Sequence, residues 1–337
     1  MSAKTYAAKV LDGMAKGLFA SLIIGTIIKQ IGVIFNIQII IDVGQVAQYF
    51  MGPAIGVGIA FARGAGTFTM ISAIVVGGIG AGTVKFGEAG AVIAMGEPVG
   101  ALIAALIGVE FGKFIEGKTK LDLIFVPAGI ITVGGTVGIV ASPLIAKALN
   151  QLGVFVNTLT NLQPIPMGIL LGIVVGMVLT LPISSAALCV AINIGVNDTG
   201  TIAAGAALAG CCAQMVGFAV ISWRDNKASG FFAQMLGTSM IQVPNIIKNP
   251  LIWIPPTIAS GVCGLVSAIG FKMLSTSVGA GMGTSGLVGQ FATYGAMGAK
   301  SLLPMLITHF LLPAVISLAA AEFMRRKNWI KEGDLAL

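Results

Sequence analysis

The stretch GTSMIQVPNIIKNPLIWIPP, residues 237–256, interrupts a chain that is otherwise dominated by long apolar runs. It contains four prolines, and proline breaks or kinks a helix because it lacks a backbone N–H and clashes with the preceding turn. Its first part, residues 237–249, also holds several polar side chains. Because no helix runs unbroken through this stretch, its backbone groups need hydrogen-bond partners outside a regular helix.

The composition of the whole chain places this break inside a membrane protein. Of the 337 residues, 56% are hydrophobic and 9% are charged, against about 25% charged in typical soluble proteins. The mean hydropathy is +1.00. The strand alternation of a membrane β-barrel is absent, and a helix needs about 20 residues to cross the bilayer. We therefore expect an all-α integral membrane protein with about ten transmembrane helices and broken or re-entrant segments.

Uninterrupted apolar runs predict where these spans lie. They are near residues 15–35, 44–63, 67–84, 90–111, 122–148, 166–180, 183–196, 200–222, 250–271 and 300–324. Lysines and arginines concentrate after the fourth, eighth and last of these runs, at residues 113–120, 224–227 and 325–331. Because positively charged loops stay on the cytoplasmic side, we expect both the N- and the C-terminus in the cytoplasm.

Two further segments differ from ordinary spans. LPISSA, residues 181–186, places a proline and two serines between apolar runs, and residues 279–299 contain seven glycines. Backbone groups freed from a helix cannot face lipid, so the breaks at 181–186 and 237–249 should be buried in protein or line a water-filled cavity. We expect the glycine-rich segment to be re-entrant or external.

A faint internal repeat connects the break at 237–249 with an earlier part of the chain. Gly82-Thr83 leads through apolar sequence to Glu97-Pro98, and Gly237-Thr238 leads in the same way to Asn249-Pro250. Transporters often contain such repeats, and their broken segments meet at the substrate site.

The amides of the break are the first candidate ligands for a solute. Gln242, Asn245 and Asn249 are spaced by three and four residues, which puts them on one side of a helix. Amides donate and accept hydrogen bonds, as the hydroxyls of a sugar-like solute require. Lys248 either meets an anionic group or extends toward the cytoplasm as a topology marker.

Two titratable residues lie within apolar runs. Glu97, in AVIAMGEPVGALIAAL, is a functional candidate because a carboxylate in a membrane is costly unless it is paired or hydrated. The alternative is a helix break near an interface, where Glu97 caps the next helix or extends to water. His309 is the only histidine and lies between two prolines, where it suits a proton-linked or phosphoryl-linked site. A hydrogen bond to a neighbouring helix carbonyl is the alternative for His309.

Ser184 and Ser185 are weaker candidates, because serines in such positions usually bond to helix carbonyls. The four cysteines lie in apolar stretches without CxxC spacing, so we interpret them as core residues. Neither a P-loop nor a dinucleotide fingerprint is present, and the lone histidine does not suggest a metal site. We expect no cofactor and no catalytic centre. The basic residues sit at segment ends rather than in a patch, which disfavours nucleic-acid binding.

Three runs carry a resemblance to a known family. They are GEPVGALIAALIGVEFGKFIEGKTKLDLIFVPAGIITVGGTVGIVASPLIAKAL, MGILLGIVVGMVLTLPISSAALCVAINI and GTSMIQVPNIIKNPLIWIPPTIASGVCG. With them, residues 15–325 resemble the IIC component of bacterial phosphotransferase-system sugar transporters. The chain is most similar to the stand-alone branch that includes perfringolysin regulator-like proteins, and more distantly similar to fructose-type IIC. The motif IQVPNIIKNP is the most specific part of the likeness.

The resemblance implies a homodimer of multi-pass subunits in the bacterial plasma membrane, surrounded by lipids. It implies one IIC-like domain over residues 1–337, with no IIA or IIB domain in the chain, so that a separate IIB protein would phosphorylate the sugar. Fructose-type proteins carry a glutamate in the motif that corresponds to residues 237–249, and here Gln242 or Asn245 stands near its place. The polar residues of fructose-type proteins after the LGxxxG helix are likewise replaced, here by residues 181–185.

The leading hypothesis is therefore a permease that binds a small polyhydroxylated solute at the broken segments and translocates it. The expected solute-binding residues are Gln242, Asn245, Asn249, Glu97, Ser184, Ser185 and His309. One alternative is a membrane regulator that senses a ligand with little transport. Another is a secondary transporter driven by protons through Glu97 or His309.

Overall fold

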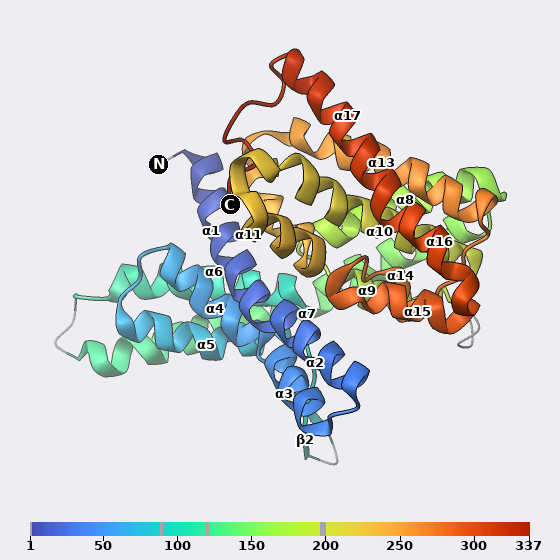
Figure 1. The fold of residues 1–337 in the computed structure, drawn as a ribbon. Coiled ribbons are helices and arrows are strands. Elements are labelled where there is room, and N and C mark those ends of the chain that lie inside the picture. Colours follow the sequence, from blue (N-terminus) through green and yellow to red (C-terminus); the bar gives the residue numbers. More distant parts are fainter. Residues whose placement is uncertain (1, 88–89, 119–120, 196–199) are drawn as a thin grey trace. The chain divides into compact units, whose positions relative to one another are not determined.

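The computed structural model describes residues 2–87, 90–118, 121–195 and 200–337, and about 81% of the chain is helical (Figure 1). The chain divides into two compact units, Met1–Ala148 and Leu149–Leu337. Helix α7, Asp122–Thr160, begins in the first unit and ends in the second. Each unit is described by itself.

The first unit is a helical bundle with one small hairpin. Its elements are α1 (Ala3–Leu18), the π-helical turn η1 (Phe19–Ile23), α2 (Ile24–Phe35), α3 (Gln38–Tyr49), α4 (Met51–Ala62), α5 (Thr67–Ala81), β1 (Val84–Gly87), β2 (Gly90–Ile93) and α6 (Pro98–Ile115). Helix α4 packs against α1, α5 and α6, while α2 and α3 pack on each other and extend from that bundle (Figure 1). Gly82 ends α5 in the left-handed conformation that glycine adopts without strain, and Pro98 starts α6.

The second unit combines long helices with many short helical pieces. Its elements after α7 are α8 (Pro164–Thr180), α9 (Ser185–Ala191), α10 (Ile202–Ile221), α11 (Trp223–Phe232), η2 (Ala233–Gly237), η3 (Ser239–Gln242), α12 (Val243–Lys248), η4 (Pro250–Trp253), α13 (Ile254–Leu265), η5 (Val266–Gly270), α14 (Ser277–Ala280), η6 (Ser285–Leu287), α15 (Val288–Met297), η7 (Gly298–Ser301), α16 (Leu302–Met305), η8 (Leu306–Leu311) and α17 (Leu312–Arg326). Three of these pieces, η2, η5 and η8, are π-helical.

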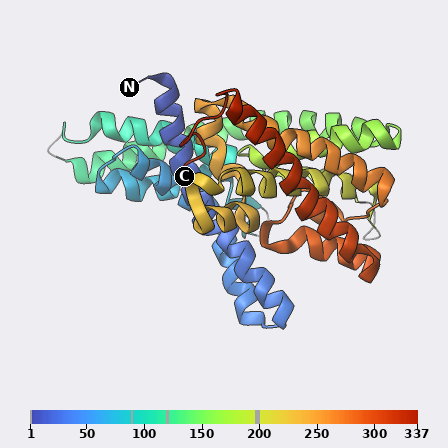
Figure 2. The ribbon, with the colours of Figure 1, turned by 45° about the horizontal axis from the view of Figure 1, so that its top comes forward.

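Helix α10 is the centre of the second unit. It is buried along almost its whole length and packs against α8, α13 and α17; Figure 2 shows these helices from a second side. Close packing is allowed by glycines: a Cβ at Gly210 would overlap the backbone of Gly172 on α8, and a Cβ at Gly172 would overlap the carbonyl of Ser260 on α13. Small residues serve the same purpose at helix interfaces of other membrane proteins.

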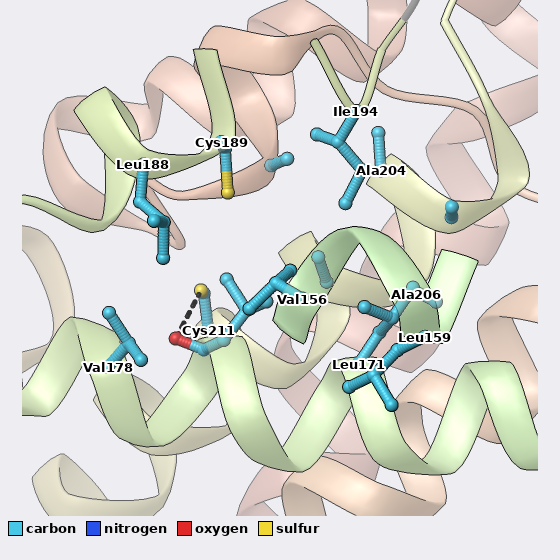
Figure 3. Close-up of a cluster of buried hydrophobic side chains, with 14 of the residues drawn as sticks. Val156, Leu159, Leu171, Val178, Leu188, Cys189, Ile194, Ala204, Ala206 and Cys211 are labelled. Atoms are coloured by element: carbon cyan, nitrogen blue, oxygen red, sulfur yellow. Dashed lines mark hydrogen bonds between the residues drawn. The ribbon is translucent and has the colours of Figure 1, made fainter. Parts of the chain in front are cut away.

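An apolar core fills the space between α7, α8, α9 and α10. Val156, Leu171, Leu188, Cys189 and Cys211 meet there (Figure 3), and the Cys211 thiol lies 3.6 Å from the carbonyl oxygen of Val175. All four cysteines are unpaired and buried, so their interpretation as core residues is confirmed.

The structure confirms an all-α membrane protein in outline, but not the count of ten spans. Among the described residues, six helical stretches are long and apolar enough to cross a bilayer: Ala3–Phe35, Pro98–Ile115, Asp122–Thr160, Ile202–Ile221, Pro250–Gly270 and Ser285–Arg326. Three more apolar helices, α4, α5 and α8, are shorter. The predicted span at 183–196 contains only the seven-residue helix α9, which is far below the length that a crossing needs.

Two local features were missed by the sequence analysis. The predicted helix at 90–111 begins only at Pro98, because residues 90–93 form strand β2, which pairs with β1 in antiparallel orientation. Strands of four residues are too short for an alternating pattern to be recognised. The glycine-rich segment at 279–299 is mostly helical from residue 285 onward and continues into α16 and α17.

The contact between α10 and α8 gives a first prediction. Gly210→Val should lower the free energy of unfolding by about 1–3 kcal/mol, because the new side chain has no space and the helices must separate. Unfolding of the purified protein in detergent measures the change. Gly270→Ala is the matched control, since its Cβ would lie 3.5 Å from the nearest heavy atom. Equal stability of the Val variant and the wild type would show that α8 and α10 do not need this approach.

Candidate functional site

The break at 237–249 forms short helical pieces, as its prolines predict. The π-helical turn η2 ends at Gly237, and Thr238 is extended and caps η3 by accepting a hydrogen bond from the Met240 N–H at 3.1 Å. Asn249 is extended as well, and its Oδ1 accepts a hydrogen bond from the Leu251 N–H at 3.2 Å. The backbone therefore changes direction twice within a dozen residues, and its freed groups are capped by neighbouring side chains.

Two amides of this break, Gln242 and Asn245, lie together and are buried. Gln242 Nε2 donates to the backbone carbonyl of Leu335 at 2.9 Å, and Asn245 Nδ2 donates to that of Ala336 at 2.8 Å. Asn245 Nδ2 also reaches Gln242 Oε1 at 2.9 Å. The two residues thus share one environment, as their spacing predicts, and in this state they hold the segment that follows α17.

Asn249 and Lys248 extend the same group of polar side chains. Asn249 Nδ2 donates to the carbonyl of Trp329 at 3.0 Å and to Asp334 Oδ2 at 2.8 Å. The Lys248 ammonium donates to Asn245 Oδ1 at 3.3 Å while the rest of that side chain is exposed. All three predicted amides therefore have protein partners here.

A second polar network crosses the centre of the unit. Gln214, on α10, is fully buried, and its Oε1 accepts hydrogen bonds from Trp253 Nε1 at 3.0 Å and Thr180 Oγ1 at 3.2 Å. Its Nε2 donates to the hydroxyls of Thr257 at 3.3 Å and Ser260 at 3.1 Å. Gln214 therefore uses all of its hydrogen-bonding capacity and ties α10 to α8 and α13.

This network reaches the break through one further bond. The hydroxyls of Thr180, at the end of α8, and Ser239, in η3, lie 2.8 Å apart. A polar side chain buried among apolar helices is costly unless it is satisfied, so the network positions the break against the central helix.

His309 belongs to a third polar group, on the π-helical turn η8. Its Nδ1 lies 3.2 Å from Gln290 Nε2 on α15, and the same amide nitrogen lies 3.4 Å from Cys212 Sγ on α10. The histidine is fully buried. Its partner is thus a glutamine side chain rather than the helix carbonyl that the sequence analysis considered.

Polar atoms without partners surround this pair. Within the described part of the chain, His309 Nε2, Gln290 Oε1 and Thr293 Oγ1 are buried and make no hydrogen bond. Thr293 follows Gln290 by three residues and therefore shares its side of α15. Buried polar groups in native proteins are nearly always satisfied, so such orphaned atoms mark a place where water or a ligand binds.

The remaining predicted residues, Ser184, Ser185 and Glu97, make other contacts. Ser184 caps α9 by accepting a hydrogen bond from the Ala187 N–H at 3.3 Å, and Ser185 donates to the carbonyl of Gly281 at 2.7 Å. Glu97 belongs to the first unit, where its N–H donates to the carbonyl of Ala81 at 2.8 Å directly before Pro98 starts α6.

Three functional candidates were not recognised in the sequence. Gln214, Gln290 and Trp253 stand in or beside apolar helices, and a glutamine within such a run is the signal that identifies the first two. Among the residues that the structure describes, no group of three His, Cys, Asp or Glu side chains is placed to hold a metal ion. The arrangement offers neutral hydrogen-bond donors and acceptors, which suit an uncharged polar solute.

Comparison with known proteins identifies one family. The family model described as "Phosphotransferase system, EIIC" matches residues 8–337, which is nearly the whole chain. Comparison with curated proteins gives no match.

The Gln214 network gives a second prediction. Gln214→Leu should lower the free energy of unfolding by at least about 2 kcal/mol, because the Trp253 N–H and the hydroxyls around it lose their partner in an apolar interior. Gln163→Leu, at an exposed glutamine, is the control and should change stability little. If both variants unfold alike in detergent, the network does not hold the helices together.

Proposed function

Because the chain belongs to the phosphotransferase system EIIC family, it is a sugar-transporting membrane permease, and we propose that His309 and Gln290 bind a hydroxyl group of its sugar. The polar groups of the second unit support the proposed sugar-binding residues.

The proposal rests on two buried atoms of the His309–Gln290 pair, His309 Nε2 and Gln290 Oε1, that make no hydrogen bond within the described structure. The Gln290 amide nitrogen faces both His309 Nδ1 and Cys212 Sγ, so it acts as the donor and His309 Nδ1 as the acceptor. The proton of the neutral imidazole then lies on Nε2. One free donor, His309 Nε2–H, and one free acceptor, Gln290 Oε1, remain within the described structure. A sugar hydroxyl accepts one hydrogen bond and donates another, and therefore complements this pair.

The site is closed in this structure, which agrees with a transporter that alternates between states. His309, Gln290 Oε1 and Thr293 Oγ1 are shielded from solvent. A solute reaches them only after the surrounding segments move, and η8 is a π-helical turn, a feature that often marks functional sites.

The amides of the break form a second set of proposed solute ligands. Gln242, Asn245 and Asn249 supply donors that match sugar oxygens, and peptide carbonyls accept these donors in the present state. Glu97, Ser184 and Ser185 stay predictions as ligands; Ser184 caps α9, and Ser185 donates to the carbonyl of Gly281.

The family also supports the setting of this activity. We infer a single EIIC domain made of both units, because one family model covers residues 8–337. A separate IIB protein phosphorylates the sugar, and the permease works as a homodimer in the bacterial plasma membrane with both termini in the cytoplasm. Sugar uptake that depends on phosphoenolpyruvate in permeabilised cells is the expected sign of this coupling. Uptake that depends on pH and is lost in Glu97→Gln would instead favour the proton-driven alternative.

The site itself is tested by binding. One of D-glucose, D-fructose, D-mannitol and D-sorbitol should stabilise the purified protein by about 2.7 kcal/mol at a hundredfold excess over its Kd. Gln290→Met removes the acceptor and the contact that orients His309 while keeping a similar volume, and should weaken that binding at least about tenfold. Thermal unfolding with each sugar measures both effects.

Gln163→Met, at an exposed glutamine, is the matched control and should bind like the wild type. Equal stabilisation of the Gln290 variant and the wild type by the same sugar would remove His309 and Gln290 from the site. Binding without uptake would support the ligand-sensing regulator instead of the permease.

A further inference from the structure

The segment that follows α17 folds back onto the broken helix. Asn328 reverses the chain with a left-handed backbone, and residues 328–337, here called the tail, lie against α11 and the break (Figure 1). Two apolar side chains anchor the tail: Ile330 and Leu335 are buried in a cluster with Phe218 and Ile246. The residues between them, 331–333, are exposed.

The polar contacts of the tail are made mainly to its backbone. Asn226 Nδ2 and Gln242 Nε2 both donate to the carbonyl of Leu335, at 2.7 and 2.9 Å, and Asn245 Nδ2 donates to that of Ala336 at 2.8 Å. The Leu337 N–H donates in turn to Asn226 Oδ1 at 2.9 Å. The amides that suit a sugar are thus occupied by backbone carbonyl oxygens of the tail, which is folded into turns.

Such a tail is built to detach more easily than a helix of the bundle. It adds two buried anchors and seven hydrogen bonds to α11 and the break, while seven of its ten residues are exposed. Segments with few buried contacts open locally while the rest of the protein stays folded. Release of the tail would return Gln242, Asn245 and Asn249 to solvent together.

The break connects the tail to the proposed sugar site. Gln242 Nε2 donates to Gln234 Oε1 at 3.0 Å, and Gln234 lies in the π-helical turn η2. The next residue, Met235, accepts a hydrogen bond through its carbonyl from the Thr284 hydroxyl. Thr284 precedes η6, which leads directly into α15 and Gln290. A continuous chain of contacts therefore runs from the tail to the residue that orients His309.

We propose that the tail is an autoinhibitory latch: while it occupies the amides of the break, it keeps the break and the His309–Gln290 site closed, and its release opens both. That this site binds a sugar rests on the proposed function, whereas the latch itself does not. Its test therefore uses no sugar.

Two full-length variants weaken the contact between the tail and the break, one by a change in the break and the other by a change in the tail. Asn245→Asp turns a donor toward the tail into an acceptor that faces the carbonyl of Ala336 and Gln242 Oε1. Asp334→Ala changes only the tail and removes the acceptor of Asn249 Nδ2 and of the Lys331 N–H. Asn161→Asp is the matched control, because that exposed amide bonds only to its own helix at Asn157.

Hydrogen exchange followed by mass spectrometry measures the first consequence. Amides of residues 328–337 should exchange about tenfold faster in Asn245→Asp and severalfold faster in Asp334→Ala, and amides of 237–249 should accelerate with them. Helices α8 and α10 should stay as protected as in the wild type. Faster exchange of the tail alone, or no change in either variant, would overturn the latch.

A native cysteine reports on the site. Cys212 is buried next to Gln290 Nε2, so N-ethylmaleimide should label it severalfold faster once the tail is released. Cys189, buried in the apolar core between α8, α9 and α10, should stay unlabelled and so distinguish opening from unfolding. If Asn245→Asp exposes all the cysteines, Asp334→Ala decides the result. Released tails with an unlabelled Cys212 would refute control of the site by the latch.

Discussion

The second unit depends on the close approach of α10 to α8 and α13. Helix α10 has no lipid-facing or solvent-facing side of any extent, so its neighbours must fit against small residues, and Gly210 lies directly on the backbone of Gly172. The same approach places the hydroxyl of Ser260 3.0 Å from the carbonyl oxygen of Gly210. Gln214, one turn further along α10, then reaches Ser260 and Trp253. The approach of α10 to α8 and α13 therefore both fits the helices together and gives the buried polar side chains their hydrogen-bond partners.

The need of buried polar groups for hydrogen-bond partners explains much of the remaining architecture. A bilayer offers no water to unpaired groups, so each interruption of a helix must supply its own partners. The break at 237–249 does this with Thr238 and Asn249 as caps and with a tail that provides carbonyl acceptors. The His309–Gln290 pair is different, because part of its capacity is unused within the described residues. In the proposed function, this unused capacity is what a sugar hydroxyl satisfies.

On the proposed latch, one set of side chains serves two states. Gln242 and Asn245 have the chemistry that the sequence analysis associated with a sugar, yet in this state they bind peptide carbonyls. Both ligands present oxygen acceptors, so one can replace the other. On this proposal, the same donors exchange a peptide carbonyl for a sugar hydroxyl when the tail is released.

The sequence by itself determined that this is a helical membrane protein of the EIIC family, broken near Pro244 and Pro250. Hydropathy, charge and proline are properties of single residues and their neighbours, so they can be read along the chain. It also placed Gln242, Asn245 and Asn249 on one side of the break, because helical spacing is local.

Tertiary structure decided which partners these residues meet. The tail lies about ninety residues from Gln242 along the chain, and Gln290 meets His309 across two helices. The number of membrane-spanning helices and the pairing of the short strands β1 and β2 also escaped prediction, because marginal lengths such as that of α9 are resolved only by packing. Contacts between distant segments depend on how all the helices pack together, and no single stretch of sequence specifies that packing.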